Sequence, residues 1–438
     1  MPHSHSMSKR FQSPGHVVVI GAGIVGLGTA WVLARDGWQV TVVDRDQPGT
    51  GASGGNGAQL SYSYVQPLAD PGIWSQLPKL LLSPDSPLRF RLQADPAQWS
   101  WLMRFMMACR GSVSRDTTRQ LLALAARSRQ VFEMLLQQED LTCDYSASGK
   151  LVLYPDAKGL DGARRQLDVQ HSLGGALQLI LKPDACVHVE PALAHYASRV
   201  AGGVYTPSEC AVDCGALCAA LHQRLADQGV RFVLGQPVRG WVTEKDEARA
   251  IQLQEQTLEA DAFVLAAGTG SVHLSRHWGV RLPIYPLKGY SITLPLTGDQ
   301  THQAPRVSIT DLSRKVVFAR LGDRLRVAGM AELVGEDRSV DPARIASLKS
   351  ATQQLFPGVM DEATDVQPWA GLRPATPRGL PLLGRHPAMP ANVCLNTGHG
   401  ALGLTLSMGS AESVRQYLRQ WTSDPADPRL PAPVACSA

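Results

Sequence analysis

The sequence predicts an α/β protein with two units, one built on a parallel sheet and one on an antiparallel sheet. A strand, a Gly-rich turn, a helix and a second strand follow one another over residues 16–43, the pattern of a βαβ unit. Residues 280–335 alternate apolar and polar positions, as half-buried strands do. The chain of 438 residues is 44% hydrophobic and 18% charged, so it can bury a large core and is not disordered.

The first unit begins with a strand at 16–20, a helix at 24–35 and a strand at 39–43. The turn between them contains Gly21, Gly23 and Gly26. In this spacing the first glycine permits a tight bend, the second lets the backbone approach a pyrophosphate, and the third lets helix pack on strand. The phosphate then meets the positive end of the helix dipole. Asp44 ends the second strand and is placed to bind ribose hydroxyls, so the pattern predicts dinucleotide binding.

The remaining elements are read in chain order. Residues 50–64 form a long functional loop, and residues 86–185 have a largely helical composition. Further helices and strands follow from the apolar spacing. The expected helices are 117–138, 214–228, 342–355 and a final one that follows the Gly-rich segment 396–406 and runs to about 421. The expected strands are 230–234, 238–243, 263–267, 291–295, 315–320 and 325–330.

Charge and cysteine content exclude several classes of function. The 42 basic and 38 acidic residues give a net charge of +4, too small and too evenly spread to predict nucleic acid as the partner. The chain has no run of about 18 uncharged apolar residues, so no transmembrane helix is expected. Cys210, Cys214 and Cys218 are spaced by four without a second cluster or a histidine at ligand spacing. We therefore expect no metal site, and buried thiols in a reducing cytoplasm.

Six segments together resemble the D-amino-acid-oxidase superfamily of flavoproteins, which includes glycine oxidase and sarcosine oxidase. Within it the sequence is similar to the small subunit of bacterial D-amino acid dehydrogenases. The loop at 51–59 departs from the family's usual Ser-x-Ala-Asn-Ala-Gly. The segments are VIGAGIVGLGTAWVLARDGWQVTVVDR (19–45), GASGGNGAQLSYSY (51–64), EPAL (190–193), YPLKGYSIT (285–293), WAGLRPATPRGLPLLG (369–384) and LNTGHGALGLTLSMGS (395–410).

The resemblance implies two discontinuous domains. A Rossmann-type FAD-binding domain would comprise 14–85, 186–279 and 369–422. A D-amino-acid-oxidase-like substrate domain with an antiparallel sheet would comprise 86–185 and 280–368. Residues 1–13 and 423–438 would be flexible tails.

The resemblance also implies non-covalent FAD, because no Cys or His occupies a family position for a flavin bond. Residues from Gly398 onward precede the final helix, whose positive end would face the flavin's pyrimidine edge and stabilise negative charge there. The predicted cofactor residues are Gly21, Ala22, Gly23, Ile24, Val25, Gly26, Asp44, Arg45, Ser53, Asn56, Gln59, Leu60, Val238, Ala267, Gly268, Gly371, Arg373, Gly398, His399, Gly400, Leu402, Gly403, Leu404 and Thr405.

The substrate would be a small amino acid, whose carboxylate suits the planar fork of an arginine. The resemblance assigns this role to Arg373 in Gly-Leu-Arg-Pro. Tyrosines of two family motifs are candidates to line the pocket, and His399 is interpreted as a positioning residue rather than a base. The predicted catalytic residues are Arg373, Tyr290, Tyr285 and Tyr62, with Tyr64 as a further lining candidate.

The implied reaction is oxidative deamination of D-amino acids to 2-oxo acids and ammonia, by hydride transfer from Cα to flavin N5. Electrons would pass to a respiratory-chain quinone or carrier. Three alternatives stay open: a D-hydroxyproline or D-proline dehydrogenase, a glycine- or sarcosine-type oxidase that uses oxygen, and a flavin subunit with a structural role. An NAD-dependent dehydrogenase is least favoured.

The resemblance places the protein in the cytoplasm, at the inner face of the inner membrane. Residues 98–108 (QWSWLMRFMMA) combine two Trp, one Phe and three Met around a single Arg. This composition fits a membrane interface, although a core or a contact in a homo- or hetero-oligomer is the more frequent use of such a segment.

Overall fold

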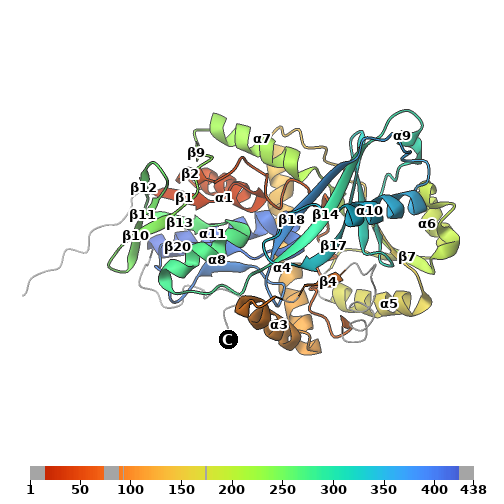
Figure 1. Cartoon of the computed structure of the whole chain (residues 1–438), viewed down its shortest axis with the longest axis horizontal. Helices are drawn as coiled ribbons and strands as arrows, with labels where there is room; N and C mark the ends of the chain where they lie inside the picture. The colour runs from red at the N-terminus through yellow and green to blue at the C-terminus, as the bar shows by residue number, and fades with distance from the viewer. Residues whose placement is uncertain (1–14, 74–87, 92, 173–174, 424–438) are drawn as a thin grey trace, which may run out of the picture.

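The computed structural model describes residues 15–73, 88–91, 93–172 and 175–423. A parallel-sheet part and a part built on a large, mainly antiparallel sheet lie side by side (Figure 1). The predicted tails 1–13 and 423–438 lie outside the described residues, except that Ser423 is the last residue of a helix rather than part of a tail. In the part of the chain that is described, no helix has the length and apolar character needed to cross a membrane.

The predicted βαβ unit forms at the expected residues. β1 (His16–Ile20) and β2 (Gln39–Val43) pair in parallel, and α1 (Ile24–Arg35) connects them. The sheet has the strand order β19-β20-β13-β1-β2-β9, and only β19 and β20 pair antiparallel in it. The other strands are β9 (Arg231–Val233), β13 (Ala262–Leu265), β19 (Leu382–Arg385) and β20 (Val393–Thr397). The central position of β1 puts its Gly-rich turn at the carboxyl edge, where parallel sheets bind ligands.

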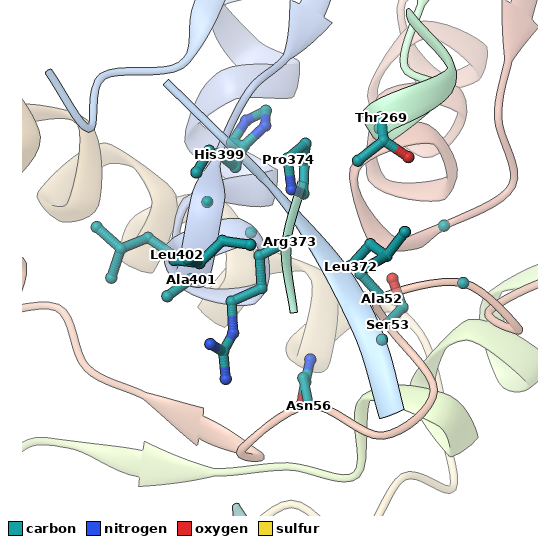
Figure 2. Close-up of a pocket in the computed structure, with 18 of the residues that line it drawn as sticks. Ala52, Ser53, Asn56, Thr269, Leu372, Arg373, Pro374, His399, Ala401 and Leu402 are labelled. Carbon is teal, nitrogen blue, oxygen red and sulfur yellow. The ribbon is translucent and has the colours of Figure 1, made fainter. Parts of the chain in front are cut away.

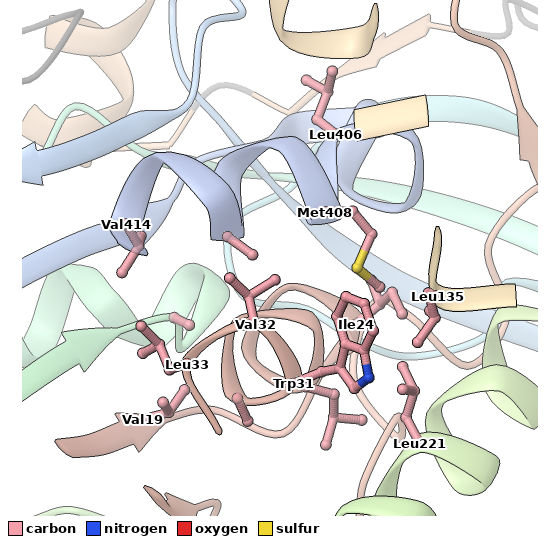
Figure 3. Packing of buried hydrophobic residues seen from close by; sticks show 14 of the residues in the cluster. Val19, Ile24, Trp31, Val32, Leu33, Leu135, Leu221, Leu406, Met408 and Val414 are labelled. Atoms are coloured by element: carbon pink, nitrogen blue, oxygen red, sulfur yellow. The ribbon is translucent and has the colours of Figure 1, made fainter. Parts of the chain in front are cut away.

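The core of the parallel-sheet part lies where α1 packs against α11 (Gly403–Ser423). Val32 of α1 points toward α11, whereas Leu33 lies toward Val19 of β1 and Trp31 toward Leu135 and Leu221 (Figure 3). Two further helices, α4 (Gly111–Gln138) and α7 (Cys214–Asp227), close this core. Fully burying each of these large side chains contributes roughly 1.5–3 kcal/mol to folding.

The large sheet has the strand order β18-β14-β17-β16-β15-β5-β7-β6, with β4 beside β17. Its pairings are antiparallel except those of β15 with β5 and of β17 with β4. The strands are β4 (Leu88–Phe90), β5 (Lys150–Tyr154), β6 (Leu179–Leu181), β7 (Gly202–Thr206), β14 (Tyr285–Pro295), β15 (Ser308–Asp311), β16 (Val316–Leu321), β17 (Arg324–Leu333) and β18 (Gln367–Ala375).

Helix α10 (Pro342–Leu355) packs against one face of this sheet, where Leu348 and Leu355 join the core with Ile292 of β14. The opposite face carries the functional cavity described below. The other helices and small strands are α3 (Pro96–Ala108), α5 (Ala157–Ser172), α6 (Pro183–Val189), α8 (Ser271–Ser275), α9 (Gln300–Gln303), β3 (Gln59–Leu60), β8 (Cys210–Ala211), β10 (Gly240–Glu244), β11 (Glu247–Gln252) and β12 (Thr257–Glu259).

Several expectations need correction. The segment 86–185 is only partly helical, because β4, β5 and β6 lie within it. These strands have three to five residues and pair with strands far away in the chain, so local patterning does not reveal them. Helix α4 begins at Gly111 rather than at 117. The expected antiparallel sheet also takes in two parallel pairings and strands from outside 280–335.

The predicted division into two discontinuous domains stays a prediction. Residues 202–206 and 369–375 fall in the ranges predicted for FAD binding, yet β7 and β18 pair within the large sheet. Sheet pairing therefore favours assigning these two strands to the substrate domain.

Candidate functional site

A cavity of about 1040 Å³ lies between the carboxyl edge of the parallel sheet and the face of the large sheet opposite α10. Its walls include the Gly-rich turn after β1, the end of β2 and the loop 51–59. The large sheet contributes residues of β14, β17 and β18, and the segment leading into α11 closes another side. The two halves of the molecule thus meet in one continuous site.

The three glycines of the first turn have different surroundings. Gly21 has φ +117°, and a Cβ there would lie 2.4 Å from the carbonyl oxygen of Ala266. A Cβ on Gly26 would lie 1.8 Å from the carbonyl oxygen of Gly21. A Cβ on Gly23 would approach only the Ser53 hydroxyl, at 3.2 Å, and Gly23 lines the cavity. Gly21 and Gly26 therefore serve the packing of the turn, whereas Gly23 keeps its surface open to a ligand.

Asp44 lines the cavity at the end of β2. Its carboxylate accepts hydrogen bonds from the N–H of Ala22 at 2.6 Å and of Asp46 at 2.9 Å, which fix its orientation. Burial raises the pKa of this carboxyl, and the two backbone donors oppose that shift. Val238 lines the cavity just before β10, beside Gln236, whose buried side-chain oxygen lacks a partner in the described structure. This end of the cavity offers free acceptors suited to sugar hydroxyls.

The loop 51–59 is attached to the large sheet. Gln59 donates hydrogen bonds to the carbonyl oxygens of Ile309 and Phe318, both at 3.2 Å. The guanidinium of Arg326 on β17 donates to the carbonyl oxygen of Asn56 at 3.0 Å. Ser53 accepts a hydrogen bond from the N–H of Ile24 at the start of α1, at 3.0 Å. The loop thus bridges the dinucleotide turn and the large sheet.

Arg373 is the predicted carboxylate ligand, and it lies in the cavity wall. It extends from β18 beside Ala401 and Leu402 (Figure 2), and its Nη1 donates to the carbonyl oxygen of Met330 at 2.9 Å. A Cβ on Gly289 of the neighbouring strand would lie 2.2 Å from Nη2, so glycine there makes room for the guanidinium. Burial lowers the pKa of Arg373 to about 10, which leaves it charged at neutral pH.

No carboxylate of the described residues lies within ion-pair distance of Arg373. A half-buried guanidinium that lines the cavity, has spare donors and lacks a counter-charge among the described residues is suited to bind an anion from outside the chain, and a carboxylate matches its fork.

The predicted tyrosines are placed differently from expectation. Tyr290 touches the cavity wall, but its hydroxyl donates to Glu332 at 2.8 Å. The alternation along β14 puts Tyr290 on the same face as Ile292, toward α10. Tyr62 and Tyr285 do not line the cavity in the described structure, because Tyr62 joins the core beside Arg129 and Tyr285 packs near Trp101. Tyr64, a further lining candidate, does reach the wall.

The segment before α11 has the expected shape. Gly398 and Gly400 have φ of +82° and +56°, and residues 400–402 form a short 3₁₀ turn that leads into the helix. His399 is buried, and its Nε2 lies 3.1 Å from the Ser410 hydroxyl. Burial lowers its pKa to about 3, so the ring is neutral and takes up no proton at neutral pH. A positioning role for His399 agrees with this geometry.

Most of the predicted cofactor residues line the cavity. Three do not, in the part of the chain described: Ala22, Gly26 and Leu60 are buried behind the wall. Their assignment as contacts therefore loses its geometric support, while the remaining assignments stay predictions that this geometry favours. Among the described residues no group of three or more His, Cys, Asp or Glu could hold a metal.

Among the residues of the wall that sequence reasoning missed are Trp369 and Lys150. The indole of Trp369 packs over Gly55 and Gly371, where a Cβ would lie 2.2 and 2.0 Å from ring atoms. Trp369 stands four residues before Arg373 on one strand, so period-2 alternation would have placed both on one face. Lys150 opens the apolar run KLVLY, and a charge in such a run is itself a signal.

The residues present fit a dinucleotide with a ring system at its far end. The turn leaves room at Gly23 for a pyrophosphate, and Asp44 with Gln236 offers acceptors for the sugar. The cavity then continues to Leu372, Arg373 and the turn before α11, where a flat ring and a carboxylate could lie together.

Comparison with known proteins agrees with this geometry. The family model described as DAO, FAD dependent oxidoreductase, matches residues 16–417. The chain is 45% identical over 405 residues to D-amino acid dehydrogenase 2 of Ralstonia nicotianae, covering 90% of this chain and 94% of that protein. It is 43% identical over 407 residues to D-amino acid dehydrogenase 2 of Pseudomonas aeruginosa, covering 92% and 94%.

Two solved structures confirm the predicted fold class. Glycine oxidase from Geobacillus kaustophilus has a TM-score of 0.72 at 20% identity, covering 93% of this chain and 95% of that one. L-proline dehydrogenase from P. horikoshii has a TM-score of 0.72 at 15% identity, covering 94% of each chain. At these identities the likeness concerns the fold. The family match over nearly the whole chain goes further: the protein belongs to the DAO family of FAD-dependent oxidoreductases.

Proposed function

We propose that the protein oxidises D-amino acids to 2-oxo acids and ammonia with non-covalently bound FAD. The observation that carries this proposal is Arg373, a half-buried cation in the cavity wall that has no carboxylate partner among the described residues. The relatives named D-amino acid dehydrogenase support the choice of substrate.

The chain's own residues divide the work of holding the cofactor. Gly23 and the first N–H groups of α1 would face the pyrophosphate, and Asp44 would accept hydrogen bonds from the ribose. Thr405 and its neighbours at the start of α11 would face the pyrimidine edge, where the helix dipole favours negative charge. Bound FAD supplies the acceptor for the hydride that leaves Cα of the substrate.

Arg373 would fix the substrate carboxylate, and with it the direction in which Cα points. Its cross-strand partner Leu287 and the nearby Met330 give this part of the wall an apolar surface, which excludes water from the reacting atoms. No protein base is required when the amine is bound neutral, and His399 has too low a pKa to serve as one. The chain therefore acts by orientation and charge placement. The imine product reacts with water to release ammonia.

The electrons would go to a respiratory-chain acceptor, and the exposed apolar face of α3 is a candidate surface for contact with the membrane that holds it. Trp99, Met103 and Met107 on its outer face are 49%, 56% and 51% exposed, while Trp101 and Phe105 on its inner face line the cavity. We propose peripheral contact of this outer face with the cytoplasmic side of the inner membrane. Co-sedimentation with anionic vesicles should fall when Met103 and Met107 are both replaced by Gln; unchanged binding would exclude this helix.

One screen tests the proposed function and separates it from its alternatives. The purified holoprotein is assayed with D- and L-amino acids, glycine, sarcosine, D-proline and cis-4-hydroxy-D-proline, using an artificial electron acceptor or oxygen alone. Turnover of acyclic D-amino acids with the dye and little with oxygen is expected. Activity confined to the cyclic substrates, or equal rates with oxygen, would replace the proposal by a proline-type dehydrogenase or an oxidase. Acid precipitation should release all the flavin into the supernatant.

A further inference from the structure

Lys150 is a buried cation on the cavity wall that neither the fold nor carboxylate binding explains. It is the first residue of β5, it is only 4% exposed, and it lines the cavity. Its Nζ donates to the Ser61 hydroxyl at 2.8 Å and lies 4.5 Å from the centre of the Tyr64 ring. An ammonium group has three donors, so at least one lacks an acceptor among the described residues.

The charge of Lys150 is incompletely balanced. Glu209 is a buried carboxyl that acts on Lys150 electrostatically, but the two form no ion pair within 4 Å in the described structure. One oxygen of Glu209 accepts a hydrogen bond from the N–H of Ser63 at 2.7 Å, and the other has no partner. Burial lowers the pKa of Lys150 to about 8, against the opposing effect of Glu209, so the amine is mostly protonated at neutral pH.

A short chain of contacts links Lys150 to the start of α11. The Ser61 side chain accepts the hydrogen bond from Lys150, and the Ser61 N–H donates to the Thr405 hydroxyl at 3.2 Å. Thr405 lies in the first turns of α11, the segment assigned above to the flavin's pyrimidine edge. Lys150 and the positive end of α11 therefore both act on this region, whereas Arg373 lies on β18, the edge strand of the large sheet.

We propose that Lys150 supplies a fixed positive charge that favours reduction of the bound flavin. The inference rests on the placement of FAD in the proposed function. A hydride carries two electrons and one proton, so its arrival adds one negative charge to the ring system. A cation held in a water-poor wall stabilises charge that develops nearby, at no cost of reorganisation. Ser61 is a positioning residue, because it holds the amine toward Thr405.

The test is the reduction potential of the holoprotein, measured by equilibration with a redox dye in the absence of any amino acid. Lys150→Met should lower the equilibrium constant for two-electron reduction by about tenfold or more, a fall of about 30 mV. Lys150→Arg keeps the charge and should stay within about threefold of wild type. Lys158→Met, an exposed lysine at the start of α5, is the matched control and should change nothing. An unchanged potential in flavin-loaded Lys150→Met would overturn the proposal.

Two provisions keep the test decisive. Lys150→Gln removes the charge but can still donate to Ser61, so it replaces the methionine variant if that variant does not fold. If both neutral variants bind FAD weakly, the ratio of the binding constants for reduced and oxidised FAD replaces the potential, and a ratio that falls in the neutral variants but not in Lys150→Arg supports the proposal. An unchanged ratio in both neutral variants would contradict it. The potential is measured without any substrate. If the D-amino acid screen fails but the potential of Lys150→Met is still shifted, only the proposed function is refuted.

Discussion

Arg373 owes its role to what surrounds it as much as to its own chemistry. Its guanidinium lies over Gly289, is held by one backbone carbonyl, and faces no carboxylate of the described chain. Arg378, five residues later in the same motif, instead pairs with Asp116 at 3.1 Å. Two arginines of one segment thus have opposite surroundings, and this difference distinguishes a ligand-binding group from a structural one.

Replacing Arg373 should therefore damage substrate binding without removing the flavin. Arg373→Ala should cost about 2–5 kcal/mol in the binding of the carboxylate, so kcat/KM should fall by at least about 30-fold. Arg373→Lys keeps the charge but loses the fork, so KM should rise markedly while flavin content stays normal. Steady-state kinetics on flavin-loaded protein measures this, with Arg378→Ala as the control. Values for Arg373→Ala within threefold of wild type would place the carboxylate elsewhere.

At the scale of elements, different glycines of the turn between β1 and α1 serve packing and ligand binding. Gly23→Ala adds a methyl group that meets only the Ser53 hydroxyl within the protein. Without cofactor it should melt near the temperature of the wild-type apoprotein, but it should bind FAD poorly, because the methyl group takes the space of the pyrophosphate. Gly26→Ala puts a methyl group 1.8 Å from a backbone oxygen and should lower the melting temperature even without cofactor.

The flavin-to-protein ratio and a thermal melt by circular dichroism check this pair. Full flavin content in Gly23→Ala would show that Gly23 does not contact the pyrophosphate of the cofactor. A Gly26→Ala protein as stable as wild type would show that the turn can open, against the packing described above.

The elements also show what the sequence can and cannot predict. β1, α1, β2 and α10 lie at their predicted residues because their signals are local: apolar runs, a Gly-rich turn and a Pro at the start of a helix. β5 escaped prediction because its partners β15 and β7 are distant in the chain. In the site, the pairing of β14 with β17 shifts register between Lys288 and Tyr290. This shift sets the face on which Tyr290 lies, and it depends on the partner strand rather than on the sequence of β14 alone. The motif predicted Arg373 as the carboxylate ligand, but its lack of an acidic neighbour is a property of the folded chain.

At the scale of the whole molecule, Glu139 joins three helices of the parallel-sheet part. It follows α4 and accepts hydrogen bonds from Trp31 of α1 at 2.9 Å and from Arg224 of α7 at 2.6 Å. Burial disfavours its ionised form, but the hydrogen bonds from Trp31, Arg224 and Gln228 prevail and lower its pKa. The stabilisation is therefore present above the ordinary pKa of a glutamate and is lost as the pH falls through the lowered value.

Glu139→Gln should reduce the free energy of unfolding by about 1–3 kcal/mol at pH 7, because a neutral amide accepts weaker hydrogen bonds from the buried Trp31 and Arg224 donors than a carboxylate does. The difference from wild type should shrink below about pH 4.5, near the ordinary glutamate pKa. Urea unfolding at several pH values measures it. Glu133 is exposed and pairs with Arg129 on the same helix, so Glu133→Gln should change stability by less than about 0.5 kcal/mol. Equal effects of the two substitutions, or a pH-independent one, would contradict the role given to Glu139.

The central claim is that FAD in this cavity accepts hydride from a D-amino acid held by Arg373. The most direct measurement is the visible absorbance of the bound flavin after mixing with D- or L-alanine in the absence of oxygen. The account predicts bleaching by the D-isomer in wild type, no bleaching by the L-isomer, and bleaching by the D-isomer at least about 30-fold slower, at low substrate concentration, in Arg373→Ala. Equal bleaching by both isomers, or an undiminished rate in Arg373→Ala, would contradict it.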